Sequence, residues 1–246
     1  MRTALISVFV CSMLVASGAF AKAPQAGKQV ACAFTTKAGV QVKYLLYLPS
    51  DYAESKRQWP LVLFLHGRGE SNGPLKLVTK WGPPRMAARG DKLPYILVSP
   101  QCPPEDHWSK PKQHVRLHEL LDLVLQQHAV DQDRVYLTGL SMGGYGSWTL
   151  AGQRPERFAA VAPICGGGKP GDAQRLKKLP IWVFHGDQDT AVPLTKSLEM
   201  VDAIRKAGGK QLRFTTLEHV GHNSWSAAYA TPGLFNWMLS KRRQKE

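Results

Sequence analysis

Six short, mostly apolar runs recur between residues 60 and 216, separated by longer stretches of mixed polarity. Runs of this kind are typical of strands buried on both faces, as in a parallel sheet covered by helices. Two earlier stretches, residues 29–34 and 40–48, are predicted to pair antiparallel through a turn around Gly39. The six runs are residues 60–65, 94–99, 134–138, 159–164, 180–184 and 212–216.

Helical periodicity fills several of the intervals between these runs. In residues 113–128, apolar side chains recur at i, i+3, i+4, i+7 and i+8, which places them on one helix face. Residues 193–207 and 232–241 also predict helices, each with a proline in its first turn. The alternation predicts an α/β fold: a mostly parallel sheet with antiparallel N-terminal strands and helices on both faces.

Residues 1–21 have the form of a secretory signal peptide. Arg2 precedes an uncharged, largely apolar stretch, and Ala19-Phe20-Ala21 matches a cleavage site. The apolar stretch is too short to span a bilayer, which requires about 20 residues. The sequence therefore predicts an exported protein, periplasmic or secreted, without a transmembrane anchor after cleavage. Residues 22–246 would form a single domain.

The chain is strongly basic, with 32 Lys and Arg against 18 Asp and Glu and a formal net charge of +14. A hydrophobic content of 43% excludes a disordered chain. Basic charge on an exported protein favours anionic surroundings, such as cell-wall polymers or acidic polysaccharide, although it could also serve solubility alone. No nucleic-acid-binding motif accompanies the charge, so we expect no nucleic-acid partner.

Three cysteines remain after the predicted cleavage: Cys32, Cys102 and Cys165. Export permits disulfides, but an odd number leaves at least one thiol unpaired within the chain. Cys102 and Cys165 both follow predicted strands, which favours them as a pair without establishing the bond. His114 and His118 lie four apart on a predicted helix, but no third ligand accompanies them, and we expect no metal site.

Residues 139–144 read Gly-Leu-Ser-Met-Gly-Gly and join a predicted strand to a predicted helix over residues 145–153. This strand–turn–helix context is the one that a nucleophile elbow requires. Small residues are needed two positions either side of Ser141 because the turn is tight, and Gly139 and Gly143 provide them. The backbone N–H of Met142 would lie at a helix N-terminus, where it can stabilise an oxyanion.

A catalytic serine needs a base, and the base needs an acid to orient it. Residues 185–193 follow a predicted strand and offer Asp187 and Asp189, either of which could be the acid. The last predicted strand leads to His219 and His222. We favour His222 as the base because it follows a glycine in a polar turn, whereas His219 is closer to the strand.

The loop after the strand at residues 60–65 reads His-Gly-Arg-Gly-Glu, and its glycines permit an unusual backbone. The N–H of Arg68 is the second candidate oxyanion donor. Its side chain is expected to form a local ion pair with Glu70. Trp108 follows another strand and is a candidate substrate-binding residue at the rim of the site, with simple packing as the alternative. Trp225 is expected to support His222.

These motifs resemble the α/β-hydrolase superfamily, and more closely the single-domain bacterial phospholipase/carboxylesterase-like esterases. That group is also described as predicted peptidases and is related to feruloyl esterases and polyhydroxyalkanoate depolymerases. The resemblance extends over roughly residues 60–239, with LHGRGE, GLSMGG, FHGDQDTAVP and GHNSW as its clearest segments. It implies Ser141 as nucleophile, Asp189 as acid and His222 as base, with no cofactor.

The resulting hypothesis is a serine carboxylesterase acting through an acyl-enzyme. Cap domains of this fold usually follow the strand at residues 159–164, and residues 165–179 leave no room for one. An open site favours short-chain acyl esters or acyl groups on a polymer, such as an acylated polysaccharide or cell-wall polymer. A serine peptidase, an acyltransferase and a non-catalytic binder of polysaccharide remain as alternatives.

Overall fold

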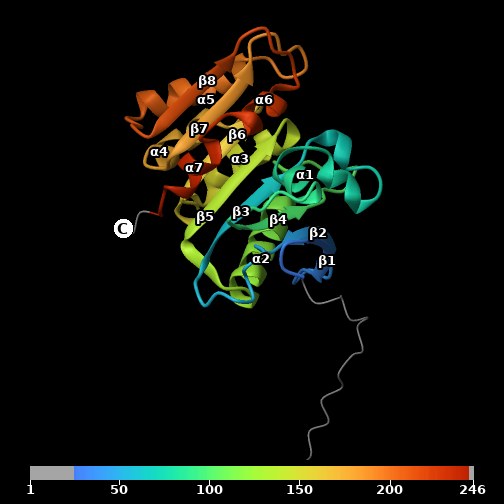
Figure 1. The fold of residues 1–246 in the computed structure, drawn as a ribbon. Helices are drawn as coiled ribbons and strands as arrows, with labels where there is room; N and C mark the ends of the chain where they lie inside the picture. Colours follow the sequence, from blue (N-terminus) through green and yellow to red (C-terminus); the bar gives the residue numbers. More distant parts are fainter. Residues whose placement is uncertain (1–24, 244–246) are drawn as a thin grey trace, which may run out of the picture.

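The computed structural model describes residues 25–243. Its centre is an eight-stranded sheet in the order β1-β2-β4-β3-β5-β6-β7-β8 (Figure 1). The strands are β1 Gln29–Thr35, β2 Gln41–Tyr47, β3 Trp59–Leu65, β4 Ile96–Pro100, β5 Val130–Leu140, β6 Ala160–Ile164, β7 Ile181–Gly186 and β8 Leu212–Leu217. The predicted signal peptide, residues 1–21, lies outside the described residues.

The sheet is antiparallel at its N-terminal edge and parallel elsewhere. Strand β2 pairs antiparallel with β1 and with β4, and every pairing from β4 onward through β8 is parallel. Strand β3 is buried along its whole length, as its continuous apolar run predicts. The predicted fold class, an α/β-hydrolase sheet with helices on both faces, is confirmed.

Helices cover both faces of the sheet. Side chains of a strand point alternately to the two faces, so the apolar strands give each face its own cluster. Leu61 and Leu63 of β3 share one apolar cluster with residues of α2, α3, α4 and α5. Val62 and Phe64 share the other with residues of α1, α6 and α7. The helices are α1 Gly82–Ala88, α2 Pro111–Gln127, α3 Met142–Gln153, α4 Ala173–Leu176, α5 Thr195–Lys206, α6 Ser224–Ala230 and α7 Leu234–Leu239; the 3-10 helices are η1 Arg68–Glu70, η2 Leu75–Lys80, η3 Pro155–Arg157 and η4 Pro170–Asp172.

The connection between β6 and β7 is short, as expected. It holds only η4 and the four-residue helix α4, so no inserted domain covers the sheet at this position. Helices α1 and α6, seven residues each, were not predicted. Within residues 25–243, none of the helices combines the length and the apolar character that a membrane crossing requires.

The favoured pairing of Cys102 with Cys165 is wrong. All three cysteines in the described chain are free thiols. Cys102 and Cys165 are both fully buried, but they belong to the two different apolar clusters, on opposite faces of the sheet. Strand ends are a poor guide to cysteine pairing because the sequence does not say toward which face each side chain points.

Candidate active site

Ser141 occupies the sharp turn between β5 and α3. Its backbone has φ 52° and ψ −115°, a conformation that side chains rarely adopt. The turn is tight enough to exclude side chains from its neighbours: a Cβ on Gly143 would lie 1.9 Å from the Leu65 carbonyl oxygen. A Cβ on Gly139 would lie 2.5 Å from the Gly143 carbonyl oxygen. The predicted elbow geometry is therefore present, and it turns the Ser141 side chain out of the strand.

Three side chains from different loops form one hydrogen-bonded relay. The Ser141 Oγ lies 2.9 Å from His222 Nε2, and His222 Nδ1 lies 2.8 Å from Asp189 Oδ2. A carboxylate accepts only, so Nδ1 carries the ring proton and Nε2 is free to accept from the serine hydroxyl. The Asp189 side chain is fully buried, and that of His222 is about one-third exposed at 29%. The structure thus brings together the serine, acid and base that the sequence suggested.

The alternative candidates lie outside this relay. Asp187 is exposed on the loop after β7. His219 is also exposed, has a positive φ of 59°, and contacts the side chain of Gln188 at 3.4 Å. Asp189 is distinguished from Asp187 by its burial and by its reach to the ring of His222.

Backbone and side-chain donors hold the Asp189 carboxylate in place. Oδ1 accepts from the N–H groups of Ala191 and Val192 at 3.0 and 2.8 Å, so the loop closes around the acid. His185 is fully buried beside it, with Nε2 at 3.3 Å from Asp189 Oδ2 and 2.9 Å from the Val192 carbonyl oxygen. Because the Val192 carbonyl oxygen can only accept, Nε2 carries a proton and donates to it. Its Nδ1 lies 2.7 Å from the Ser197 hydroxyl of α5.

The loop carrying His222 packs against the end of β7. A Cβ on Gly186 would lie 2.1 Å from the Val220 carbonyl oxygen, so only glycine allows the acid-bearing and base-bearing segments to approach this closely. The Trp225 ring meets the His222 ring edge-on at a centroid distance of 5.2 Å, and Trp81 meets Trp225 at 5.8 Å. These aromatic contacts limit the tilt of the imidazole, which is the support expected of Trp225.

The loop after β3 lies directly against the nucleophile turn. A Cβ on Gly67 would lie 2.8 Å from the Leu140 side chain, so the residue before Arg68 lies against the residue before Ser141. The expected ion pair between Arg68 and Glu70 is wrong. The Arg68 guanidinium donates instead to the carbonyl oxygens of Pro104 and Asp106 at 3.1 and 2.7 Å, and so fastens this loop to the one after β4.

Glu70 is turned inward, which removes it from Arg68. The side chain is buried, and burial raises the pKa of its carboxyl, opposed by the charge of Lys80 and by backbone hydrogen bonds. Its Oε2 lies 3.2 Å from the place where a Gly67 Cβ would be. The acid therefore lies beneath the backbone that carries the candidate oxyanion donor.

Trp108 does not line an open rim, which corrects the expectation that it binds substrate. It is 1% exposed, its Nε1–H donates to the His66 carbonyl oxygen at 3.0 Å, and its ring meets the His66 ring at 5.2 Å. Burial lowers the pKa of His66 to about 4, so the imidazole is neutral. It accepts from the Cys102 N–H at 2.9 Å. Trp108 and His66 together brace the loop that carries Arg68.

A comparison with known families decides where this chain belongs. The family model described as "Putative esterase" matches residues 35–227, which is most of the chain. The chain belongs to this esterase family. The resemblance to α/β-hydrolase esterases related to feruloyl esterases is confirmed, and the enzyme class of the family, carboxylic ester hydrolases, is the expected one.

Several relatives of this family member are known. The crystal structure of a thermostable esterase superposes with a TM-score of 0.77 at 33% identity, over 88% of this chain and 64% of that one. Probable feruloyl esterase C of Aspergillus terreus is 28% identical over 69% of this chain and 63% of that protein. The bifunctional acetylxylan esterase/xylanase XynS20E of Neocallimastix patriciarum is 28% identical over 58% of this chain and 21% of that protein. The chain thus spans less than two thirds of each of these proteins.

Metal binding at the esterase-family triad is not favoured by its donors. Cys165, Asp189 and His222 offer ligand atoms within 4.8 Å of one another. Burial raises the pKa of the Cys165 thiol to about 12, so forming the thiolate that binds a metal is costly at this position. Asp189 and His222 are already committed to each other. His185 was not predicted as part of the site, although its place at the end of β7, four residues before Asp189, was a usable signal.

Proposed function

We propose that the protein is an exported serine carboxylesterase that hydrolyses short-chain or polymer-linked acyl esters. The observation that carries the proposal is the unbroken relay from the buried Asp189 through His222 to Ser141, on a strained elbow in an esterase-family chain. The same three side chain types at hydrogen-bond distance constitute the activated nucleophile of serine hydrolases on several unrelated folds.

The first step forms an acyl-enzyme. Ser141 Oγ attacks the ester carbonyl carbon while its proton passes to His222 Nε2, 2.9 Å away. The imidazolium that forms is stabilised by Asp189, whose carboxyl group is held in place by two backbone N–H groups. His222 then protonates the departing alcohol. In the second step His222 takes a proton from water, which attacks the acyl group and releases Ser141.

The negative charge that develops on the carbonyl oxygen needs donors fixed before the reaction. The N–H of Met142, at the start of α3, and the N–H of Arg68, in the adjoining loop, are the proposed pair. The Arg68 side chain contributes indirectly, because its bonds to the carbonyl oxygens of Pro104 and Asp106 hold that loop. Loss of one such donor in a related mechanism costs about 10²–10³ in kcat.

The substrate proposal rests on the short connection between β6 and β7 and on the names of relatives. Without an inserted segment over the sheet, a polymer can reach Ser141 without threading into a closed cavity. Relatives carry the names acetylxylan esterase and feruloyl esterase, so acyl groups displayed on polysaccharide are the favoured substrates. Export is proposed from the sequence of residues 1–21 alone, and an N-terminus at Lys22 in the mature protein would support it.

The test is hydrolysis of p-nitrophenyl esters of increasing chain length by the wild type and by Ser141→Ala. We expect activity that peaks at short chains and falls by about 10⁴–10⁶ in the variant. Covalent labelling by a fluorophosphonate, lost in Ser141→Ala, reports the activated serine directly. Unchanged activity in the variant would discard the mechanism. Labelling without ester hydrolysis would favour a peptidase, and transfer product exceeding free acid would favour an acyltransferase.

A further inference from the structure

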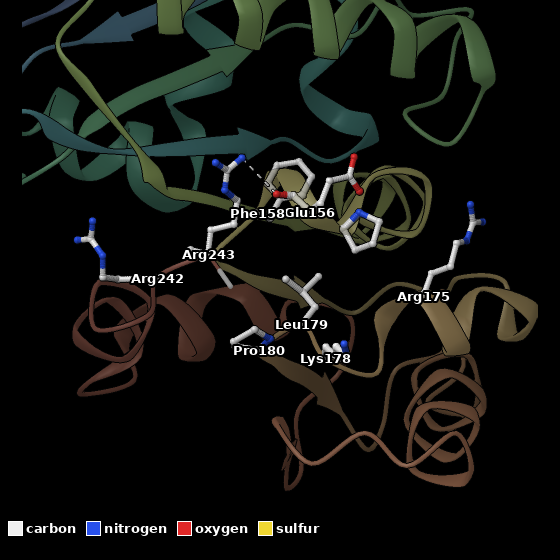
Figure 2. A pocket seen from close by; sticks show the side chains of 10 residues that line it. Glu156, Phe158, Arg175, Lys178, Leu179, Pro180, Arg242 and Arg243 are labelled. Atoms are coloured by element: carbon white, nitrogen blue, oxygen red, sulfur yellow. Dashed lines mark hydrogen bonds between the residues drawn. The ribbon is translucent and has the colours of Figure 1, made fainter. Parts of the chain in front are cut away.

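Two cavities lie side by side at the edge of the sheet opposite to Ser141. The first, of about 180 Å³, is lined by residues just before β6 and β7 and by the C-terminal segment (Figure 2). The second, of about 190 Å³, is lined by residues just before β8 and by α7. Pro180 lines both. The Gln211 side chain in the second donates to the Lys178 carbonyl oxygen in the first at 3.2 Å, which ties the two walls together.

The location separates these cavities from the catalytic relay. They open at the amino ends of the parallel strands β6, β7 and β8, whereas Ser141, Asp189 and His222 follow the carboxyl ends of β5, β7 and β8. Strand β7 has six residues, so the two edges are about 20 Å apart at 3.3 Å per residue. A group bound inside these cavities therefore does not touch the reacting atoms.

The charge around the cavities is positive on balance. Their walls carry seven Lys and Arg residues and a single acid, Glu156: Arg175, Lys178, Arg242 and Arg243 in the first cavity, and Lys210, Arg213 and Lys241 in the second. The three arginines of the first cavity are paired with Asp172, Asp131 and Asp133. Within residues 25–243, Lys178, Lys210, Arg213 and Lys241 have no acidic partner at ion-pair distance. We call these four the unpaired cations.

Two of the unpaired cations are held in place by an aromatic ring. The Arg213 guanidinium lies 5.7 Å and the Lys241 ammonium 6.0 Å from the centre of the Trp237 ring. Arg213 also lies 5.2 Å from the Trp182 ring. Cation–π contacts of this kind reduce side-chain freedom, so less entropy is lost when an anion binds. Like charges held close together without counter-charges in a concave wall also focus a positive potential toward the solvent.

We propose that these joined cavities form a docking groove for a carboxylate-bearing polysaccharide, separate from the catalytic site. Two neighbouring cavities that share Pro180 as a wall suit a linear polymer with regularly spaced charges better than a single small anion. The choice of polysaccharide rests on the proposed esterase function. Docking at this edge holds the polymer against the enzyme while other segments or chains present their esters to Ser141.

Two other anionic partners fit the groove less well. A membrane surface would call for exposed apolar residues to insert, but Val115 is the single large hydrophobic residue of the described chain that is strongly exposed, and it lies on α2. Nucleic-acid strands are bound by exposed aromatic rings on which bases stack. Trp237 is 8% exposed and is flanked by its own cations, so it offers no such platform.

The test compares binding of polygalacturonate to the wild type and to three variants, each measured by affinity electrophoresis and by co-sedimentation. The groove variant is Lys178→Gln/Lys210→Gln/Arg213→Gln. The control is Lys43→Gln/Lys56→Gln/Lys92→Gln, which removes the same charge from exposed positions elsewhere. We expect about tenfold weaker binding in the groove variant, wild-type binding in the control, and binding that weakens as salt is added. A Lys178→Arg/Lys210→Arg/Arg213→Lys variant should bind normally.

Several outcomes would overturn the groove. Equal losses in the groove variant and the control would show that only total charge matters. Equal or tighter binding of neutral xylan, a DNA duplex or anionic vesicles would show a different partner. Hydrolysis of p-nitrophenyl acetate separates this inference from the proposed function, because all variants should match the wild-type rate. An active enzyme that fails to bind polygalacturonate defeats the groove alone, and an inactive wild type defeats the esterase proposal alone.

Discussion

The backbone of Ser141 is strained, and the strain is linked to how its hydroxyl group is presented. Its φ of 52° with ψ of −115° is a conformation suited to glycine, and holding another residue there costs about 1–3 kcal/mol. Packing over-determines the turn: the Ser141 N–H donates to the Ile164 carbonyl oxygen at 3.0 Å, and Gly143 crosses the end of β3. The strain is the consequence of presenting the hydroxyl clear of both strand and helix.

The strain can be measured as a difference in stability between two variants that both lack the nucleophile. Ser141→Gly and Ser141→Ala both remove the nucleophile, but only glycine adopts the backbone conformation freely. We expect Ser141→Gly to be the more stable of the two by about 1 kcal/mol, since the relieved strain exceeds the added chain entropy of the unfolded state. Urea unfolding measures the difference. If Ser141→Ala is equally or more stable, the turn is not strained in solution.

At the scale of elements, the site depends on close crossings between backbone segments. Gly143 at the start of α3 lies against the end of β3, and Gly186 at the end of β7 lies against the loop that carries His222. These two crossings fix the distance from the nucleophile to the oxyanion loop and from the acid to the base. Neither can be widened without moving a strand of the central sheet.

The crossing at Gly143 predicts a strong position-specific effect. A methyl group there would lie 1.9 Å from a backbone oxygen that cannot rotate away, so Gly143→Ala should cost more than about 3 kcal/mol or prevent folding. Gly171→Ala is the matched control, because no atom lies within 4 Å of its Cβ position, and it should stay within about 0.5 kcal/mol of wild type. Denaturant midpoints provide the comparison. Similar midpoints for both variants would mean that the crossing is looser than described.

The strands and the nucleophile could be predicted because each carries a local signal, whereas the choice of Asp189 over Asp187 came from the resemblance to a known family. Consecutive apolar residues indicate a buried strand such as β3, and glycines two positions away on either side indicate Ser141 as the nucleophile. The surroundings of individual side chains could not be predicted in this way. Trp108 was placed at the rim because loops follow strands, yet its partner is a carbonyl oxygen 42 positions earlier. The Arg68 side chain likewise bonds to a loop 36 and 38 positions away rather than to its neighbour Glu70.

At the scale of the whole molecule, burial keeps many histidines neutral while the surface carries a large positive charge. Five of the eight histidines, among them His107, His114 and His128, have a pKa lowered by burial. For His66 and His118 the pKa falls to about 4. The formal net charge at neutral pH is already +14, so acid adds positive charge to a molecule that repels itself.

These two effects both destabilise the protein in acid, but salt separates them. Between pH 6.5 and about 4 the unfolded chain binds protons at His66 and His118 that the native state does not. The free energy of unfolding therefore falls as the pH falls through this window. Below about pH 4 these two histidines cause no further fall. For the 1%-exposed His66 the loss is at most about 3 kcal/mol.

Salt screens the repulsion between surface charges but leaves the cost of burying a charge almost unchanged. We therefore expect urea midpoints to fall from pH 7.5 to 4 in both low and high salt. In the wild type the His118 Nε2 is buried without a hydrogen-bond partner, so we expect the fall to become shallower in His118→Gln. A pH dependence that disappears in high salt would assign the acid sensitivity to surface charge instead.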